Sequence, residues 1–183
     1  MTKDLIEQVS KGESADQVVE SYRRRAKQKE TKEESLTEQP AKVTAALSKV
    51  VAEMTVLAQK TRHYHWNVTG ENFFDMHDIF GQIYDKLADE VDHVAERVVQ
   101  LGATPVHTLE TMLSLSDIEE DKSIPADMSM CKIVISDLET LVSSMSDTIT
   151  AALAANDRPT VFMIDQMVGC FEKFKWFLRA FSK

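Results

Sequence analysis

The sequence predicts an all-α protein: a four-helix bundle with a short extra helix in the long central connection. Large apolar residues recur at alternating intervals of three and four, the spacing that places them on one face of a helix. Only five glycines and four prolines occur in 183 residues, so turns are few and elements long. Hydrophobic residues make up 43% of the chain, enough for one domain with a real core.

The first two helices are separated by the turn 67-NVTG-70. The first is predicted from Ala41, with core-facing positions at Val43, Leu47, Val50, Met54, Leu57, Thr61 and Tyr64. The second is predicted over about 72–101, with its seam at Phe80, Tyr84, Leu87, Val91, Val94, Val98 and Leu101. Gly70 and Gly102 are expected to end these helices because glycine adopts a left-handed backbone at little cost.

The long connection after the second helix contains 108-TLETMLSL-115, which is predicted to be the short extra helix. The third helix is expected to begin at Asp127, read as its N-cap, and to end at Ala155. After the turn 156-NDRP-159, the fourth helix carries a last seam. Its members are Ile164, Met167, Phe171, Phe174, Leu178 and Phe181. Two short connections and one long one suit a four-helix bundle with a crossover.

Residues 1–40 differ from the rest in composition and are predicted to form a flexible N-terminal arm, while residues 41–183 form the bundle. The arm has few large apolar side chains and cannot bury enough surface to stay folded alone. Residues 14–29 are expected to be helical when docked on another surface. The basic cluster 22-YRRRAKQK-29 lies within them.

The net charge of −9 disfavours nucleic-acid binding by the chain as a whole, so any DNA contact must use the basic cluster or a bridging cation. Cys131 and Cys170 lie 39 residues apart in helical patterns, which favours a reduced cytoplasmic protein over a disulfide framework. No N-terminal signal peptide or membrane-spanning run is expected.

Two histidines and an acidic stripe suggest a metal site. His65 ends the first helix and His77 begins the second. On the second helix, one side outside the apolar seam carries Gly81, Asp85, Ala88, Asp92 and Glu96. One reading is an ordinary solvated face. The other is a surface where the small residues let a second helix approach.

Geometry places such a site between two chains. His77 and Glu96 are about 28 Å apart along one helix, too far to share one ion. If this helix packs antiparallel against its copy, His65 and His77 of one chain meet Asp92 and Glu96 of the other. Two nitrogens and two carboxylates suit Fe(II), Zn(II) or Mn(II), and a two-fold axis makes two such sites per dimer.

The other histidines fit no site. A di-iron centre inside one bundle needs two E-x-x-H motifs on different helices, and the chain has only Glu90 to His93. Both residues lie away from the seam and the stripe and are expected at the surface. His63 and His107 are likewise interpreted as polar surface residues.

The run 65-HWNVTGENFFDMH-77 followed by 92-DHVAERVVQLGATP-105 resembles the Dps family, the miniferritins. The resemblance continues to 172-EKFKWFLRAF-181 and covers roughly residues 41–183. It implies a ferritin-like bundle assembled into a hollow dodecamer. Ferrous iron would be oxidised, preferably by hydrogen peroxide, at ferroxidase sites bridging two subunits and stored as ferric mineral, protecting against oxidative damage. Many members bind DNA, which would make this cytoplasmic protein nucleoid-associated.

The resemblance implies site residues at the positions of this chain that match the family motif. His65 and His77 would be iron ligands from one subunit, and Asp92 and Glu96 from its two-fold mate. Trp66 would lie beside the site as a radical quencher, or be only an interface aromatic. Acids that line the pores or nucleate mineral are not assigned; Asp137, Glu139 and Asp147 are candidates only by type.

One position departs from the family pattern. The family usually has a carboxylate four residues after the second histidine, where this chain has Gly81. The antiparallel register offers Asp89 of the other chain as a replacement ligand. Alternatively, ferroxidase activity is impaired and the shell serves as a DNA-binding or scaffold particle, with the arm contacting phosphates. A helical bundle without metal is the third reading.

Overall fold

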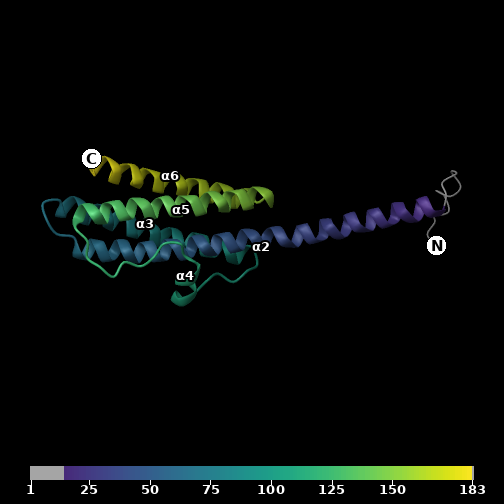
Figure 1. The fold of residues 1–183 in the computed structure, drawn as a ribbon, viewed down its shortest axis with the longest axis horizontal. Coiled ribbons are helices and arrows are strands. Elements are labelled where there is room, and N and C mark those ends of the chain that lie inside the picture. Colours follow the sequence, from purple (N-terminus) through teal and green to yellow (C-terminus); the bar gives the residue numbers. More distant parts are fainter. Residues whose placement is uncertain (1–14, 183) are drawn as a thin grey trace. The chain divides into compact units, whose positions relative to one another are not determined.

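The computed structural model describes residues 15–182, and every secondary-structure element within that range is a helix. The helices are α2 (Ala15–Asn67), α3 (Phe73–Gln100), α4 (Leu109–Leu115), α5 (Asp127–Ala154) and α6 (Arg158–Phe181). The chain divides into two compact units, Met1–Gln39 and Pro40–Lys183, which are described separately. The second unit is the bundle, and Figure 1 shows α5 and α6 side by side within it. The all-α prediction is therefore confirmed.

Side-chain contacts join the four long helices of the bundle unit. The rings of Tyr64 in α2 and Phe80 in α3 lie 5.9 Å apart between centroids. The thiol of Cys131 in α5 donates to the carbonyl of Leu178 in α6 over 3.5 Å. Arg97 in α3 reaches the start of α6, where it pairs with the carboxylate of Asp157 at 2.7 Å. Helices distant in sequence thus close one core.

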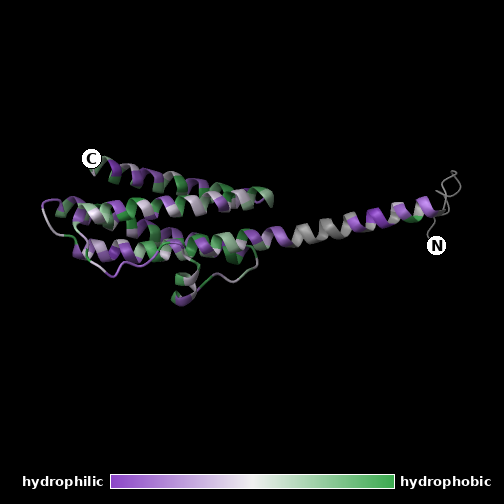
Figure 2. Cartoon of the chain, in the orientation of Figure 1, coloured by the Kyte–Doolittle hydropathy of each residue, from purple (hydrophilic) through white to green (hydrophobic). Residues whose placement is uncertain are grey.

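The core follows the predicted seams closely. All seven predicted positions of the first helix are buried, from Val43 to Tyr64. Figure 2 shows hydrophobic and hydrophilic positions alternating along the long helices of the bundle unit, as one-sided burial requires. One seam residue was placed wrongly: Phe181 is 37% exposed, because it is the last residue of α6 and no further helical turn follows to cover it, whereas Leu178 is still buried. The sequence also missed Met76 and Ile83, both fully buried in α3.

The predicted turns are largely confirmed. Gly70 and Gly102 have φ of +111° and +81°, the left-handed region that favours glycine. Thr108 caps α4, and Asp157 caps α6 by accepting from the backbone N–H of Thr160. Asp127, however, is the first residue of α5 rather than its N-cap. Its carboxylate instead accepts from the side-chain amide of Asn72, which fixes the start of α5 to that of α3.

Helix α2 is longer than predicted, beginning at Ala15 rather than Ala41 and passing through Pro40. Residues 15–39 are rich in Ala, Glu, Lys, Arg and Gln, which have high intrinsic helix propensity. The prediction relied on burial of an apolar face, which these residues lack. The flexibility of the arm remains a prediction, and residues 1–14 lie outside the described part.

The crossover between α4 and α5 is anchored to α2. The hydroxyl of Tyr64 donates to the carboxylate of Asp121 over 2.5 Å, and His63 Nε2 lies 2.7 Å from the carbonyl of Ser123. Ile118 from the same segment is buried in the core. No helix within residues 15–182 is long and apolar enough to cross a membrane.

Candidate metal-binding site

His65 and His77 are brought together, each held by the backbone of the other. Nδ1 of His65 lies 2.6 Å from the carbonyl oxygen of His77, and Nδ1 of His77 lies 2.8 Å from the carbonyl oxygen of His65. A carbonyl only accepts, so each Nδ1 must carry a hydrogen. In the neutral rings this leaves both Nε2 atoms unprotonated, the state in which histidine binds a metal.

Aromatic rings fix the orientation of this pair. The two imidazoles stack with centroids 3.6 Å apart. Phe73 stacks on His77 at 5.1 Å, and Tyr84 meets His65 edge-on at 5.2 Å. Sequence reasoning missed both neighbours. Phe73 carried a usable signal, because residues four apart on a helix lie on one face.

Gly81 lies against the ring of His65. A methyl group at position 81 would lie 3.4 Å from both Cε1 and Nδ1 of that imidazole, which is close van der Waals contact. Helix α3 therefore passes near the histidine at a position without a side chain. Any carboxylate ligand on this side must come from elsewhere.

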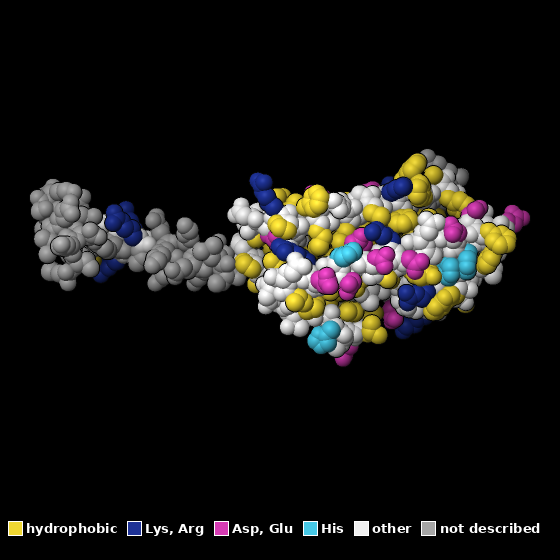
Figure 3. All heavy atoms as spheres, turned by 180° about the vertical axis from the view of Figure 1, so that it is seen from behind, with side chains coloured by type: hydrophobic (Ala, Val, Ile, Leu, Met, Phe, Trp, Pro, Cys, Tyr) yellow, Lys and Arg dark blue, Asp and Glu magenta, His cyan; other side chains and the backbone are white. Residues whose placement is uncertain are grey.

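The acidic residues of the stripe are exposed on α3. Asp92, Glu96 and Asp89 all lie at the surface of the single chain. In the space-filling view of Figure 3, acidic side chains and histidines gather on one face of the bundle unit, with hydrophobic side chains between them. Within residues 15–182 of one chain, no three or more His, Cys, Asp or Glu residues group to hold a metal ion. The proposed ligand set is therefore not assembled by one chain.

Trp66 is 62% exposed and follows His65 directly. Its side chain lines a cavity of about 260 Å³ between α2 and α4, together with Leu109 and Met112. An indole this exposed in one chain is compatible with an interface aromatic and with a radical quencher. Both interpretations of Trp66 remain predictions.

One surface assignment is wrong. Glu90 is buried, only 8% exposed, while its E-x-x-H partner His93 is exposed as expected. The carboxylate of Glu90 pairs with Lys86 and lies 3.1 Å from Nδ1 of His93. Glu90 borders the apolar seam of α3, so packing covers its stem while the charge is neutralised locally.

Other polar residues have structural partners. His63 is half-buried and also contacts the amide of Asn67, while His107 is exposed. Among the acids considered by type, Asp137 forms a largely buried pair with Lys60 at 2.6 Å. Burial raises the pKa of the Asp137 carboxyl, although the hydrogen bond from Lys60 opposes the shift. An acid engaged in this way is a poor candidate for mineral nucleation.

Comparison with known proteins places the bundle in a family. Residues 44–183 match the family model described as "Ferritin-like domain". A DNA protection during starvation protein from Brevibacillus brevis is 34% identical over 139 residues, which cover 76% of this chain and 93% of that protein.

Solved structures agree. The crystal structure of a Dps protein from Bacillus brevis has a TM-score of 0.78 and 32% identity, covering 80% of this chain and 98% of that one. The Dps protein from Vibrio cholerae O1, described as a member of a broad superfamily of ferritin-like diiron-carboxylate proteins, has a TM-score of 0.77 and 30% identity. The match covers 80% of this chain and 92% of that one.

Proposed function

Because this chain belongs to the Dps family of ferritin-like proteins, we propose that it oxidises Fe(II), preferably with hydrogen peroxide, at sites bridging two subunits of a dodecameric shell. The ferric product would be stored inside as mineral. The observation that carries this proposal is the reciprocal hydrogen bonding of His65 and His77. Because each Nδ1 is used in this way, both Nε2 atoms are left to bind a metal ion.

The donor set suits iron as substrate. Imidazole nitrogens bind Fe(II), and hard carboxylate oxygens stabilise Fe(III) as it forms. The acids would be Asp92 and Glu96 of the partner subunit, arriving through antiparallel packing of α3 about a two-fold axis. Their exposure in a single chain supports their availability.

Gly81 leaves one ligand position to be filled from another source. Asp89 of the partner subunit is the replacement we propose. Asp89 is exposed on α3, as this role requires. Water is the other candidate, because Gly81 itself offers no side-chain ligand.

Electron balance favours two irons at each site. Hydrogen peroxide accepts two electrons and, with two protons, becomes two water molecules, whereas each Fe(II) supplies one electron. A pair of ferrous ions can therefore reduce peroxide completely without releasing a hydroxyl radical. Trp66, next to His65, would intercept radicals from any single-electron step.

His77→Ala tests the proposal. Removing one imidazole should lower Fe(II) affinity by at least about tenfold, the smallest loss typical when a group that supports a metal is removed. Peroxide-driven oxidation, measured by ferric absorbance, should also be slower. His107→Ala is the matched control, because His107 is exposed and outside the site. Equal rates for the two variants and the wild type would refute the assignment.

A second function is favoured by Gly81 alone. If the missing carboxylate impairs oxidation, the shell would act as a DNA-binding or scaffold particle. Arg23, Arg24 and Arg25 are exposed in the arm and offer non-specific phosphate contacts, which many copies would multiply. Gel retardation that weakens steeply with salt, together with negligible iron oxidation, would favour this function.

A further inference from the structure

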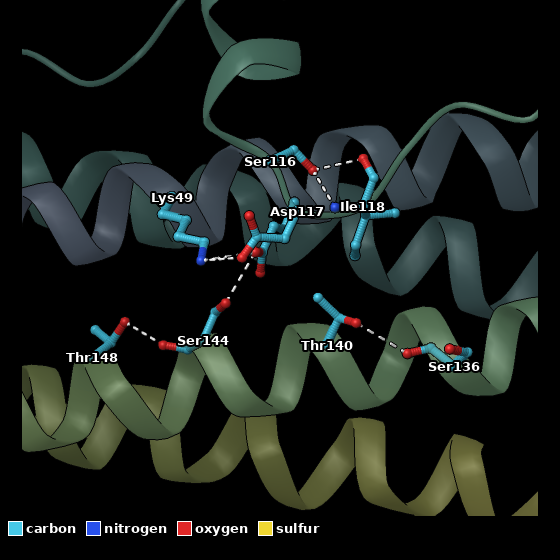
Figure 4. Close-up of polar contacts among 9 residues, drawn as sticks. Lys49, Ser116, Asp117, Ile118, Ser136, Thr140, Ser144 and Thr148 are labelled. Carbon is cyan, nitrogen blue, oxygen red and sulfur yellow. Dashed lines mark hydrogen bonds and ion pairs between the residues drawn. The ribbon is translucent and has the colours of Figure 1, made fainter.

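A second oxygen-rich cluster lies between α2, α5 and the crossover segment. It forms a cavity of about 380 Å³ lined by Lys49, Asp117, Glu139, Thr140, Ser143, Ser144 and Asp147. Figure 4 shows Lys49, Asp117 and Ser144 pointing toward one another across the space between α2 and α5. Carboxylates and hydroxyls dominate this lining, and Lys49 is its single cation.

A buried carboxylate with an unused oxygen adjoins this cavity. Glu53 is 0% exposed, and its Oε1 accepts from the hydroxyl of Ser144 over 2.9 Å. Its Oε2 has no hydrogen-bond partner among the described residues. The backbone amide of Asp117 approaches this carboxyl but leaves Oε2 unpaired. Such an atom is costly to bury, so a ligand that engaged it would bind favourably.

The ammonium group of Lys49 marks where positive charge is favoured. Its Nζ lies 2.5 Å from Asp117 Oδ2 and 3.6 Å from Glu53 Oε1. The Lys49 and Asp117 side chains are 35% and 65% exposed, so their pair adds little net stability. Lys49 can therefore turn into solvent at low cost, leaving two carboxylates facing the vacated position.

We propose that this cavity binds a hydrated divalent cation of the Mg²⁺ or Mn²⁺ type, held by Glu53 and Asp117 after Lys49 turns outward. Small hard cations keep several waters and are commonly bound through one or two carboxylates. This matches the local chemistry, because among the described residues no three or more His, Cys, Asp or Glu side chains are grouped closely enough to hold an ion without water. The hydroxyl of Ser144, already bonded to Glu53, holds the ligand carboxylate in place.

The inference does not depend on the proposed function, since it uses no residue of the interface site. The test is Mn²⁺ titration of the full-length protein, followed by the electron paramagnetic resonance signal of free Mn²⁺. Glu53→Gln should weaken one binding event per chain by at least about tenfold, the scale for groups around a metal. Asp117→Asn, at an exposed position that tolerates substitution, should have the same effect. His77→Ala should leave this event intact.

Substitution of Lys49 most clearly distinguishes a specific cation site from general attraction to surface acids. Lys49→Met removes the competing ammonium and should tighten Mn²⁺ binding several-fold, whereas Lys132→Met, on the exposed side of α5, should not. The exposed Glu110→Gln controls for diffuse attraction by surface acids. Wild-type titrations for both Glu53→Gln and Asp117→Asn, weaker binding by Lys49→Met, or an equal loss in Glu110→Gln would each overturn the proposal.

Discussion

At the scale of single residues, the histidine pair illustrates how neighbours prepare a metal ligand. The sequence allowed His65 and His77 to be selected, because helix periodicity placed them at the two ends of one turn. It did not predict that each Nδ1 would use the carbonyl of the other residue. Those bonds depend on how α2 and α3 meet after the turn, which is a tertiary property.

Gly81 is the residue whose substitution most directly tests the site. Gly81→Asp would place a carboxylate beside His65 and should raise Fe(II) affinity by about tenfold, the scale for a group added around a metal. Gly81→Ala controls for the methyl group, which reaches the imidazole at 3.4 Å, and for the gain in helix propensity. Isothermal titration with Fe(II) under anaerobic conditions measures both. An equal gain in the two variants would mean that position 81 acts through helix stability.

Tyr64→Phe removes a partly buried hydrogen bond to the charged carboxylate of Asp121. We expect a loss of about 1–2 kcal/mol in unfolding free energy at neutral pH. The hydroxyl of Tyr64 is the main reason that the pKa of Asp121 lies below its usual value. The stabilisation is therefore present above the unfolded pKa of about 3.9 and is lost as the pH falls through the lower folded pKa.

Urea unfolding at pH 6 and pH 3 measures this difference. The gap between wild type and Tyr64→Phe should narrow at the lower pH. Tyr84→Phe is the control, because its hydroxyl has no hydrogen-bond partner among the described residues. A gap that is constant with pH would show that Asp121 is not the group responsible.

At the scale of elements, periodicity predicted the helices that bury a face. Helix α3 and helix α5 lie within one residue of the predicted ranges, since glycine and asparagine follow their last turns. Helix before Ala41 was expected only for residues 14–29 when docked, not as one continuous extension of α2, and the burial of Glu90 was not predicted. Neither depends on an apolar stripe: the first follows helix propensity, and the second follows local ion pairing at the edge of the core.

Alanine substitutions at two glycines distinguish the effect of backbone conformation on stability from the effect of side-chain packing. Gly102 has φ of +81°, and a methyl group there would meet nothing within 4 Å, so Gly102→Ala should cost about 1 kcal/mol through the backbone alone. Gly169 lies inside α6 with similar open space, so Gly169→Ala should stabilise the helix by up to about 1 kcal/mol. Chemical denaturation measures both, and changes of the same sign would contradict this explanation.

At the scale of the whole molecule, the single chain carries only half of each proposed site. The histidines gather at one end of α3, while Asp92 and Glu96 lie toward the other end of the same helix. The antiparallel register inferred from the sequence relates these ends through a two-fold axis. The number of subunits depends on further surfaces that a single chain leaves exposed, including the aromatic residues Phe74, Phe162 and Trp176.

Mixed assemblies test whether two chains share each site. His77→Ala and Glu96→Gln should each oxidise iron much more slowly than the wild type when assembled alone, because every site lacks one ligand. In shells assembled from an equal mixture, half of the two-fold dimers contain both variants, and each such dimer has one intact and one doubly altered site. Iron oxidation should therefore return to about one quarter of the wild-type rate per chain. Sites built within one chain would show no recovery, because no chain in the mixture carries both ligands.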